Sequence, residues 1–269
     1  MFNIVSRCAL LWAALAFCGG VSAAGPVDDL YQAHVFVTGK ELPERTAAFG
    51  EGLKEVLVKL SGDPSLDGDA AVAQLATHAS AFVRAWAYRD LMAGIPVHDE
   101  QGTRQRPFEL TIDFDPPGID GVLVRLGREI WPAPRPRVAM FTSVVYGDSS
   151  YPLASDGERG RDQREALASA ARRFGVPIVL PSARTTLPNP AKPPDPTELE
   201  AAARALGGDV ALSGTLTWSP DALTWTAQWR LVSASRSVNW QVSGVSFDAA
   251  FRSAMEGAAR ILSGHGLPP

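Results

Sequence analysis

The sequence has little cysteine and little net charge. Only two cysteines occur, Cys8 and Cys18, and 25 lysines and arginines nearly balance 29 aspartates and glutamates, which leaves a formal net charge of -4. These numbers exclude a disulfide scaffold and a strongly basic nucleic-acid binder. With 46% hydrophobic and 20% charged residues, the composition is that of a globular protein, and it excludes a disordered acidic tail and a polytopic membrane protein.

The N-terminus has the pattern of a secretory signal peptide, which we assign to residues 1–24. Arg7 supplies a positive charge, residues 9–17 form an apolar core, and small residues follow. An uncleaved anchoring helix is the alternative, but the apolar stretch is shorter than the roughly 20 residues that span a membrane. Cleavage near Ala23 or Ala24 predicts a periplasmic protein with no membrane span.

The two cysteines bear on lipidation and on thiol chemistry. A cysteine just behind the apolar core of an exported bacterial chain can become a lipidated N-terminus, and Cys18 has that position. Phe17 precedes it where a small residue is usual, so Cys18 fits better as part of the leader. Cleavage after the leader removes Cys8 and Cys18 together. The mature chain then has no thiol for a disulfide, a metal site or a nucleophile.

The length and the prolines predict two domains. About 100 to 150 residues are usual for one domain, and three prolines interrupt residues 132–136, where neither a helix nor a central strand can continue. We therefore expect an N-terminal α+β domain at residues 26–131, a Pro-rich linker at 132–136 and a C-terminal α/β domain at 137–269. A second proline-rich stretch, 187–196, is interpreted as a long loop.

In the first domain, alternating apolar residues predict strands at residues 31–37 and 108–114. Apolar residues at steps of three and four from Phe49 to Leu60 predict a helix, which Gly62 ends at its C-terminal cap. A second apolar stripe from Val72 to Trp86 predicts another helix, and a short third helix follows the second strand. The predicted order is strand, two helices, strand, helix.

The second domain is predicted to hold a mixed sheet with the order β-α-β-α-β-β-β-α, within an overall α+β fold. Residues 146–161 are interpreted as a mobile loop. The patterns that carry this prediction are a continuous apolar strand, a helix ending at Gly175, a short strand, a helix capped by Asp195, three strands with meander spacing and a closing helix, at residues 138–145, 167–174, 176–180, 195–206, 210–218, 223–232, 238–244 and 247–262.

The first domain also resembles a known family. The resemblance rests on Leu30-Tyr31, on residues 44–59, on the string from Val56 to Asp63 and on Asp113-Phe114-Asp115. Over about residues 28–134 the chain resembles the proteobacterial exported family called domain of unknown function 2066. The resemblance implies an envelope location and no established activity. The family's recurrent residues fall on core and capping positions of this chain, so it implies no catalytic residue.

The second domain resembles another group of proteins through its element order and through Leu206-Gly207-Gly208-Asp209 followed by Gly214. These features are similar to small periplasmic domains of Tol-system, curli-secretion and peptidoglycan-synthase-activator proteins. Because those domains bind other proteins, the resemblance implies a protein partner. The proline-rich insert at 187–196 departs from the pattern and puts a shared binding edge in doubt.

Residues that often carry chemistry are scarce. The four histidines, His34, His78, His98 and His265, are neither spaced four apart on a helix nor grouped with acidic residues, so no metal site is predicted. No serine-nucleophile elbow, phosphate-binding loop or dinucleotide fingerprint occurs. We therefore predict no catalytic, cofactor-binding or metal-binding residue and no cofactor.

Two groups of aspartates can be interpreted either as functional carboxylates or as ordinary surface and capping residues. Asp113 and Asp115 share a strand end, with Asp120 beyond, and two close carboxylates are what glycoside cleavage uses. The simpler interpretation is that they are solvated or cap the following helix. The second group, with acids at positions 63, 67 and 69, lacks the spacing of a calcium-binding loop.

Four tryptophans on neighbouring predicted strands also allow two interpretations. Trp218, Trp225, Trp229 and Trp240 can form an aromatic platform for glycan or peptide, or they can pack under the last helix. Alternation places Trp225 and Trp229 on the same face as two leucines, which favours the core.

The sequence therefore predicts an exported protein that acts as a non-catalytic accessory of the envelope. We expect it to bind an envelope protein, by strand addition to a sheet edge. One alternative is a cell-wall-directed hydrolase that uses carboxylates from both domains. Another is a periplasmic carrier of a small ligand, with a sizeable apolar cleft near Trp131.

Overall fold

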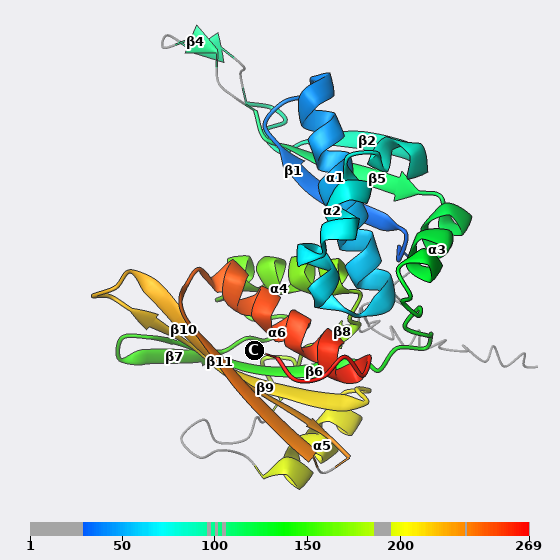
Figure 1. The fold of residues 1–269 in the computed structure, drawn as a ribbon. Coiled ribbons are helices and arrows are strands. Elements are labelled where there is room, and N and C mark those ends of the chain that lie inside the picture. The colour runs from blue at the N-terminus through cyan, green and yellow to red at the C-terminus, as the bar shows by residue number, and fades with distance from the viewer. Residues whose placement is uncertain are drawn as a thin grey trace, which may run out of the picture.

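A computed structural model describes the chain over most of its length and shows two larger β-sheets with helices packed between them, besides a two-stranded sheet of β3 (His98–Asp99) and β4 (Gly102–Thr103) (Figure 1). The α+β fold class is confirmed. The predicted signal peptide, both cysteines and most of the proline-rich loop lie outside the described residues. Within the described part, no helix is both long and apolar enough to cross a membrane. The described residues are 29–95, 98–99, 102–103, 106–185, 195–234 and 236–268.

The first sheet is antiparallel, with the strand order β1-β5-β2. Helix α1 (Leu42–Ser61) packs across one of its faces. The helix lies so close that a Cβ atom on Gly52 would come within 2.8 Å of the Ile112 side chain. As predicted, Gly62 ends the helix in the left-handed conformation, at φ 71°. The strands are β1 (Gln32–Val37), β5 (Phe108–Phe114) and β2 (Val83–Asp90).

The predicted second helix is wrong beyond its first two turns. Helix α2 (Ala70–Ala76) and a 3-10 turn, η2 (Ala79–Phe82), are followed by strand β2. Trp86 lies opposite Ile112 of β5, and its ring is 5.5 Å from that of Phe49 on α1. The residues that alternate with the aromatics of β2 are mostly small alanines, which hide the period of a strand in the sequence. The remaining elements of this half are η1 (Pro64–Gly68), β3 (His98–Asp99), β4 (Gly102–Thr103) and α3 (Pro116–Arg125).

The second sheet is mixed, as predicted, and has the order β11-β10-β9-β6-β7, with β8 paired to β6. Strand β6 is parallel to β8 and β9, while the other pairs are antiparallel. The predicted loop at residues 146–161 is wrong at its start, because β7 folds back on β6. The strands are β6 (Val138–Tyr146), β7 (Ser149–Pro152), β8 (Ile178–Val179), β9 (Val210–Ser219), β10 (Thr224–Ser233) and β11 (Arg236–Val245).

Helices cover both faces of the second sheet (Figure 1). Helices α4 (Arg161–Phe174) and α6 (Phe247–Leu262) lie side by side on one face, and α5 (Pro196–Ala205) lies on the other. Trp229 is 1% exposed and packs on Phe251 of α6, with 5.9 Å between ring centroids. Gly214 on β9 leaves room for that indole, since a Cβ there would lie 2.1 Å from it.

The segment between the two sheets is anchored to both halves. Trp131 donates its backbone N–H to the carbonyl of Leu60 at 2.8 Å. Arg135 is only 8% exposed and donates to the carbonyls of Gly175 at 2.9 Å and Leu60 at 3.3 Å. One cluster of buried apolar residues extends through both halves. The predicted linker thus lies between two packed bodies, and their division into two domains stays a prediction.

Candidate functional site

The histidines occupy separate places. His34 on β1 lies 3.6 Å from a carboxylate oxygen of Asp29 and 3.6 Å from one of Glu109. The hydrogen bond from His34 holds the pKa of Asp29 below its usual value, against the effect of partial burial. The His78 ring contacts the hydroxyl of Thr77 at 2.8 Å. No group of three metal-ligating residues occurs in the described ranges.

The paired aspartates of the hydrolase alternative have structural partners. Asp113 accepts a hydrogen bond from the Gln32 amide at 2.6 Å, and Asp115 accepts one from the backbone N–H of Gly118 at 3.0 Å. Asp115 is therefore the cap of α3, as the simpler interpretation predicts. Asp120 accepts a hydrogen bond from the Tyr31 hydroxyl at 2.8 Å, and burial together with this bond raises the pKa of Tyr31 to about 12. None of this favours acid and base roles for the three carboxylates.

The second aspartate group consists of caps and one pocket residue. Asp63 accepts hydrogen bonds from the backbone and the hydroxyl of Ser65, and Asp69 caps α2. Asp67 faces the junction described below.

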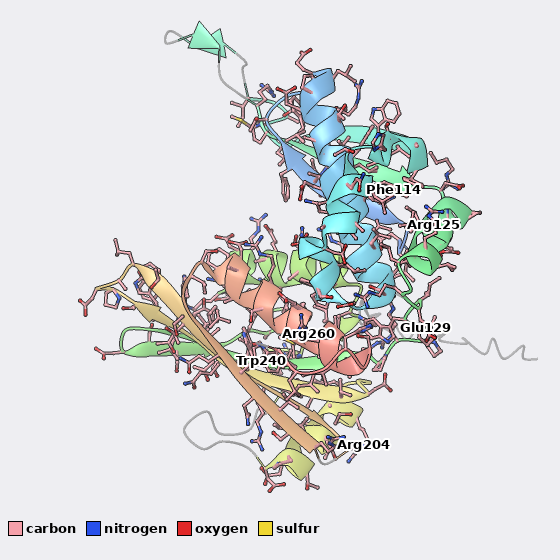
Figure 2. All side chains as sticks on the ribbon, viewed as in Figure 1. Phe114, Arg125, Glu129, Arg204, Trp240 and Arg260 are labelled. Atoms are coloured by element: carbon pink, nitrogen blue, oxygen red, sulfur yellow. The ribbon has the colours of Figure 1, made fainter. Side chains whose placement is uncertain are left out.

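The tryptophans are mainly core, as predicted. Trp225, Trp229 and Trp240 are 7%, 1% and 8% exposed. Trp240 donates its indole N–H to the carbonyl of Ser253 at 3.2 Å, where α6 passes over β11 (Figure 2). Trp218 is only partly buried.

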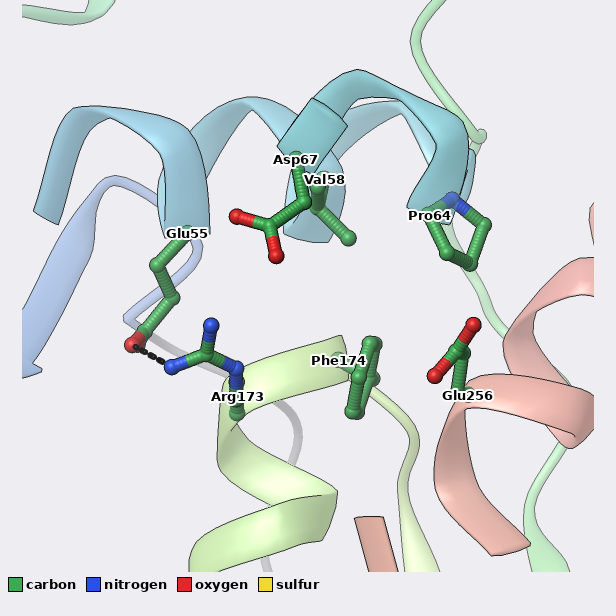
Figure 3. A pocket seen from close by; sticks show the side chains of 7 residues that line it. All are labelled: Glu55, Val58, Pro64, Asp67, Arg173, Phe174 and Glu256. Atoms are coloured by element: carbon green, nitrogen blue, oxygen red, sulfur yellow. Dashed lines mark hydrogen bonds and ion pairs between the residues drawn. The ribbon is translucent and has the colours of Figure 1, made fainter. Parts of the chain in front are cut away.

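A small pocket lies at the junction of the two halves (Figure 3). Arg173 on α4 pairs with Glu55 on α1, with 3.4 Å between nitrogen and oxygen. Burial raises the pKa of Glu256, and the negative charge of Asp67 adds to the effect. At about 70 Å³ the pocket holds a few water molecules, and it is not the apolar cleft near Trp131 that the ligand-carrier alternative expects. Its lining consists of Glu55, Val58, Pro64, Asp67, Arg173, Phe174 and Glu256.

The outer edge of β1 is closed by side chains of α1. Lys59, with no exposed surface, donates to the carbonyl of Gln32 at 2.6 Å. The backbone N–H of His34 favours the charged form of the Glu55 carboxylate, against the effect of burial on its pKa. Gln32 and His34 are alternate residues of the strand, so these backbone groups point to the same side, away from β5. Glu55 and Lys59 therefore take the place of a neighbouring strand.

Glu55 and Lys59 also form a buried ion pair. The Lys59 ammonium lies 3.8 Å from the Glu55 carboxylate. Burial lowers the pKa of Lys59 and raises that of Glu55, while each charge opposes the shift of the other. Two such charges remain in an interior only when their hydrogen-bonding groups have partners, and here the partners are the backbone of β1 and Arg173.

Two other edges are protected in simpler ways. Strand β2 is irregular between Val83 and Ala85 and carries Arg84, Arg89 and Asp90, so a bulge and three charged residues mark it. Strand β7 is four residues long and ends at Pro152. Bulges, charges, proline and shortness are the usual features that keep an edge strand from pairing with another chain.

Strand β11 has none of these features over most of its length. It is ten residues long, contains no proline, and its only ionisable residue is Arg236 at its start. It pairs with β10 along its length, and no described strand pairs with its other side. Its register is regular up to Ser243, before Gly244. Alternate residues of such an edge present free N–H and C=O groups.

The sequence alone did not reveal either edge. A glutamate and a lysine four residues apart on a helix usually form an exposed pair. The available signal was that Glu55 and Lys59 flank the apolar stripe of α1. For β11, the meander spacing predicted the strand, but its place at the end of the sheet depends on β9 joining β6.

Comparisons with known proteins add a family match to one part of the chain. Residues 24–132 match the model of a domain of unknown function, DUF8605. A domain of unknown function is thus confirmed for the first half, whereas the specific resemblance to domain of unknown function 2066 is not. No curated protein matches the chain.

A search of solved structures gives the lipoprotein GNA1162 from Neisseria meningitidis. The two chains share 19% identity, and the match covers 40% of this chain and 76% of that one, with a TM-score of 0.27. A TM-score this low does not support an inference about function. The comparisons therefore place residues 24–132 with a domain of unknown function, and the functional argument depends on the geometry of the sheet edges.

Proposed function

We propose that this chain is an exported, non-catalytic accessory protein of the cell envelope, and that it binds a partner protein by strand addition to β11. The observation that carries the proposal is the long, regular, nearly uncharged edge of β11. An extended segment on that edge gains main-chain hydrogen bonds, and its alternate side chains provide specificity. The leader pattern of residues 1–24 and the resemblance to exported families support the envelope location.

The two faces of β11 define the partner's side-chain pattern. Val238, Trp240 and Val242 lie on the face of the sheet that α6 covers, while Asn239 and Gln241 are exposed on the other. A strand paired with β11 continues both faces. We expect a partner segment in which apolar residues alternate with polar ones such as asparagine, glutamine or threonine.

The test is to charge the edge and leave the fold intact. The double variant Asn239→Lys, Gln241→Lys places two hydrated ammonium groups beside the edge, which opposes strand addition. The matched control, Thr217→Lys, Ala201→Lys, adds the same charge to exposed positions of β9 and α5, neither of which is an edge strand. Each protein is produced in the native cells and isolated from the envelope, and the recovered partner is quantified.

We expect the wild-type chain and the control to retain the partner, and the edge variant to lose it by about tenfold or more, as for an interface that loses a central contact. Hydrogen exchange on the isolated complex should show added protection in residues 236–245. Equal recovery with the edge variant, or protection elsewhere with β11 unchanged, rules strand addition out.

A further inference from the structure

A second surface of the chain carries exposed aromatic residues. Where β6 ends and β9 turns into β10, the Tyr146 ring lies 5.7 Å from that of Trp218, and the two planes are 7° apart. Trp218 contacts Trp225 at 5.2 Å between centroids, and Trp225 contacts Phe247, the first residue of α6, at 6.4 Å. Trp225 is 7% exposed, but Tyr146 is 53% exposed. We name these four residues the aromatic end cluster.

Leu223 lies in the turn between β9 and β10, beside this cluster. Its φ is 52°, a conformation that leucine rarely adopts, and its side chain is 72% exposed. An exposed leucine in an unfavourable backbone conformation gains nothing from packing. The positive φ belongs to the β9–β10 turn, as that of Ala234 belongs to the β10–β11 turn, and the exposed leucine side chain is available for contact with another molecule.

The surroundings of the cluster are acidic. Asp148 and Asp221 lie in the two turns at this end of the sheet, Asp248 lies in the first turn of α6, and all three are exposed and within three residues of a member of the cluster. No ion pair or side-chain hydrogen bond of these three occurs among the described residues. Arg159 lies over the Tyr151 ring at 4.2 Å and Arg161 pairs with Glu165, while Arg252 follows Asp248 by one turn of α6.

We propose that the aromatic end cluster is a binding site for a peptide segment in which a lysine or arginine is flanked by apolar residues. The cation lies over the outer face of the Tyr146 ring, which stacks on Trp218, the three aspartates attract it, and an apolar neighbour contacts Leu223. Elsewhere this chain uses the same contact, with Lys40 over Phe108 and Arg135 over Trp131, each at 4.3 Å. No described cation lies over Tyr146 or Trp218.

Charge decides between this ligand and two others. An anionic membrane surface is repelled by the three aspartates. A neutral glycan stacks on aromatic rings as well, but it gains no attraction from three carboxylates and little from the exposed Leu223. A cationic, apolar peptide uses all three features.

The rings of Tyr146 and Trp218 are separate from the edge of β11 at which we propose strand addition. Tyr146 and Trp218 lie on β6 and β9, with β10 between them and β11. The proposal therefore does not rest on strand addition, and either one can fail alone. The edge variant Asn239→Lys, Gln241→Lys should bind the test peptide as the wild type does.

The test uses the purified chain and a labelled peptide, acetyl-Leu-Arg-Leu-Arg-Leu-amide, with fluorescence anisotropy as the readout. Tyr146→Ala should weaken binding about fivefold or more, as expected for loss of a cation–π contact. The triple variant Asp148→Asn, Asp221→Asn, Asp248→Asn should weaken peptide binding and reduce the dependence of binding on salt. Phe36→Ala removes an aromatic side chain that is 64% exposed on β1, and should change nothing.

Leu223→Asn separates binding from folding. Asparagine tolerates positive φ, so this variant should unfold at a higher temperature than the wild type and yet bind the peptide more weakly. The same peptide with glutamate in place of arginine, and a chitin trisaccharide, are the competing ligands. The proposal is wrong if the acidic peptide binds equally well, if only the sugar binds, if nothing binds at millimolar concentration, or if Tyr146→Ala has no effect.

Discussion

Strand β1 at one edge of the first sheet and strand β11 at one edge of the second sheet differ in one respect. On β1, Lys59 of α1 binds a backbone carbonyl that a further strand would use, and Glu55 lies beside it. On β11 the corresponding side has no described partner. The closed edge lies at the junction of the halves, where Glu55 also reaches Arg173. The difference shows that this chain can close an edge with side chains, so the open edge of β11 is a candidate for function.

The largest expected effect comes from opening the closed edge. Lys59→Met removes a fully buried ammonium and leaves the Glu55 carboxylate and the carbonyl of Gln32 without it. Breaking a buried charge pair costs about 3–5 kcal/mol. We expect a loss of that size in the free energy of unfolding, measured by urea denaturation.

A double variant distinguishes edge closure from an ordinary ion pair. Replacing an ordinary buried pair by apolar residues is often neutral or stabilising. Lys59→Met with Glu55→Leu should stay clearly destabilised, because the carbonyl of Gln32 loses its hydrogen-bond partner. Recovery of wild-type stability would contradict the closure of β1 by these side chains.

A smaller effect is expected where α6 holds β11 in place. A Cβ atom on Gly257 would lie 2.6 Å from the Trp240 ring. Gly257→Ala therefore forces the helix or the indole to move, and overpacking of this kind costs about 1–3 kcal/mol. The expected result is a lower urea midpoint. Gly121→Ala is the control, because only the end of the Arg125 side chain approaches that position, at 3.6 Å; an equal loss there would contradict the account.

The smallest effect concerns the pH dependence of the junction. The raised pKa of Glu256 means that the folded protein holds this proton more tightly than the unfolded chain does. Its contribution to stability is therefore present below about pH 4.5, the ordinary value, and is lost as the pH rises through the folded pKa. Glu256→Gln should stabilise the protein at pH 7 by a fraction of about 1 kcal/mol, since the group is partly solvated.

The advantage of Glu256→Gln should shrink as the pH falls toward 4. Thermal unfolding of both proteins across this range measures the difference. An advantage that grows on acidification would have the wrong sign and would assign the raised pKa to another group.

The sequence predicted elements wherever one local pattern dominated. The end of α1 at Gly62 and the cap of α5 at Asp195 follow from short-range rules. Strand β2 was missed because small alanines alternate with its aromatics, and β7 was missed because it is only four residues long. Long-range placement decided the rest, since no local signal joins Lys59 to Gln32 or puts β11 at the end of its sheet.

Native-state hydrogen exchange of the two edges tests the central claim most directly. In the free protein, the amide of His34 should exchange slowly because the buried Glu55 and Lys59 side chains cover this edge of β1. Along residues 236–245, every second amide should exchange rapidly, with the period of two expected of an edge strand. If the His34 amide exchanges as rapidly as these, or if every amide of β11 is protected, the contrast between a closed and an open edge is wrong.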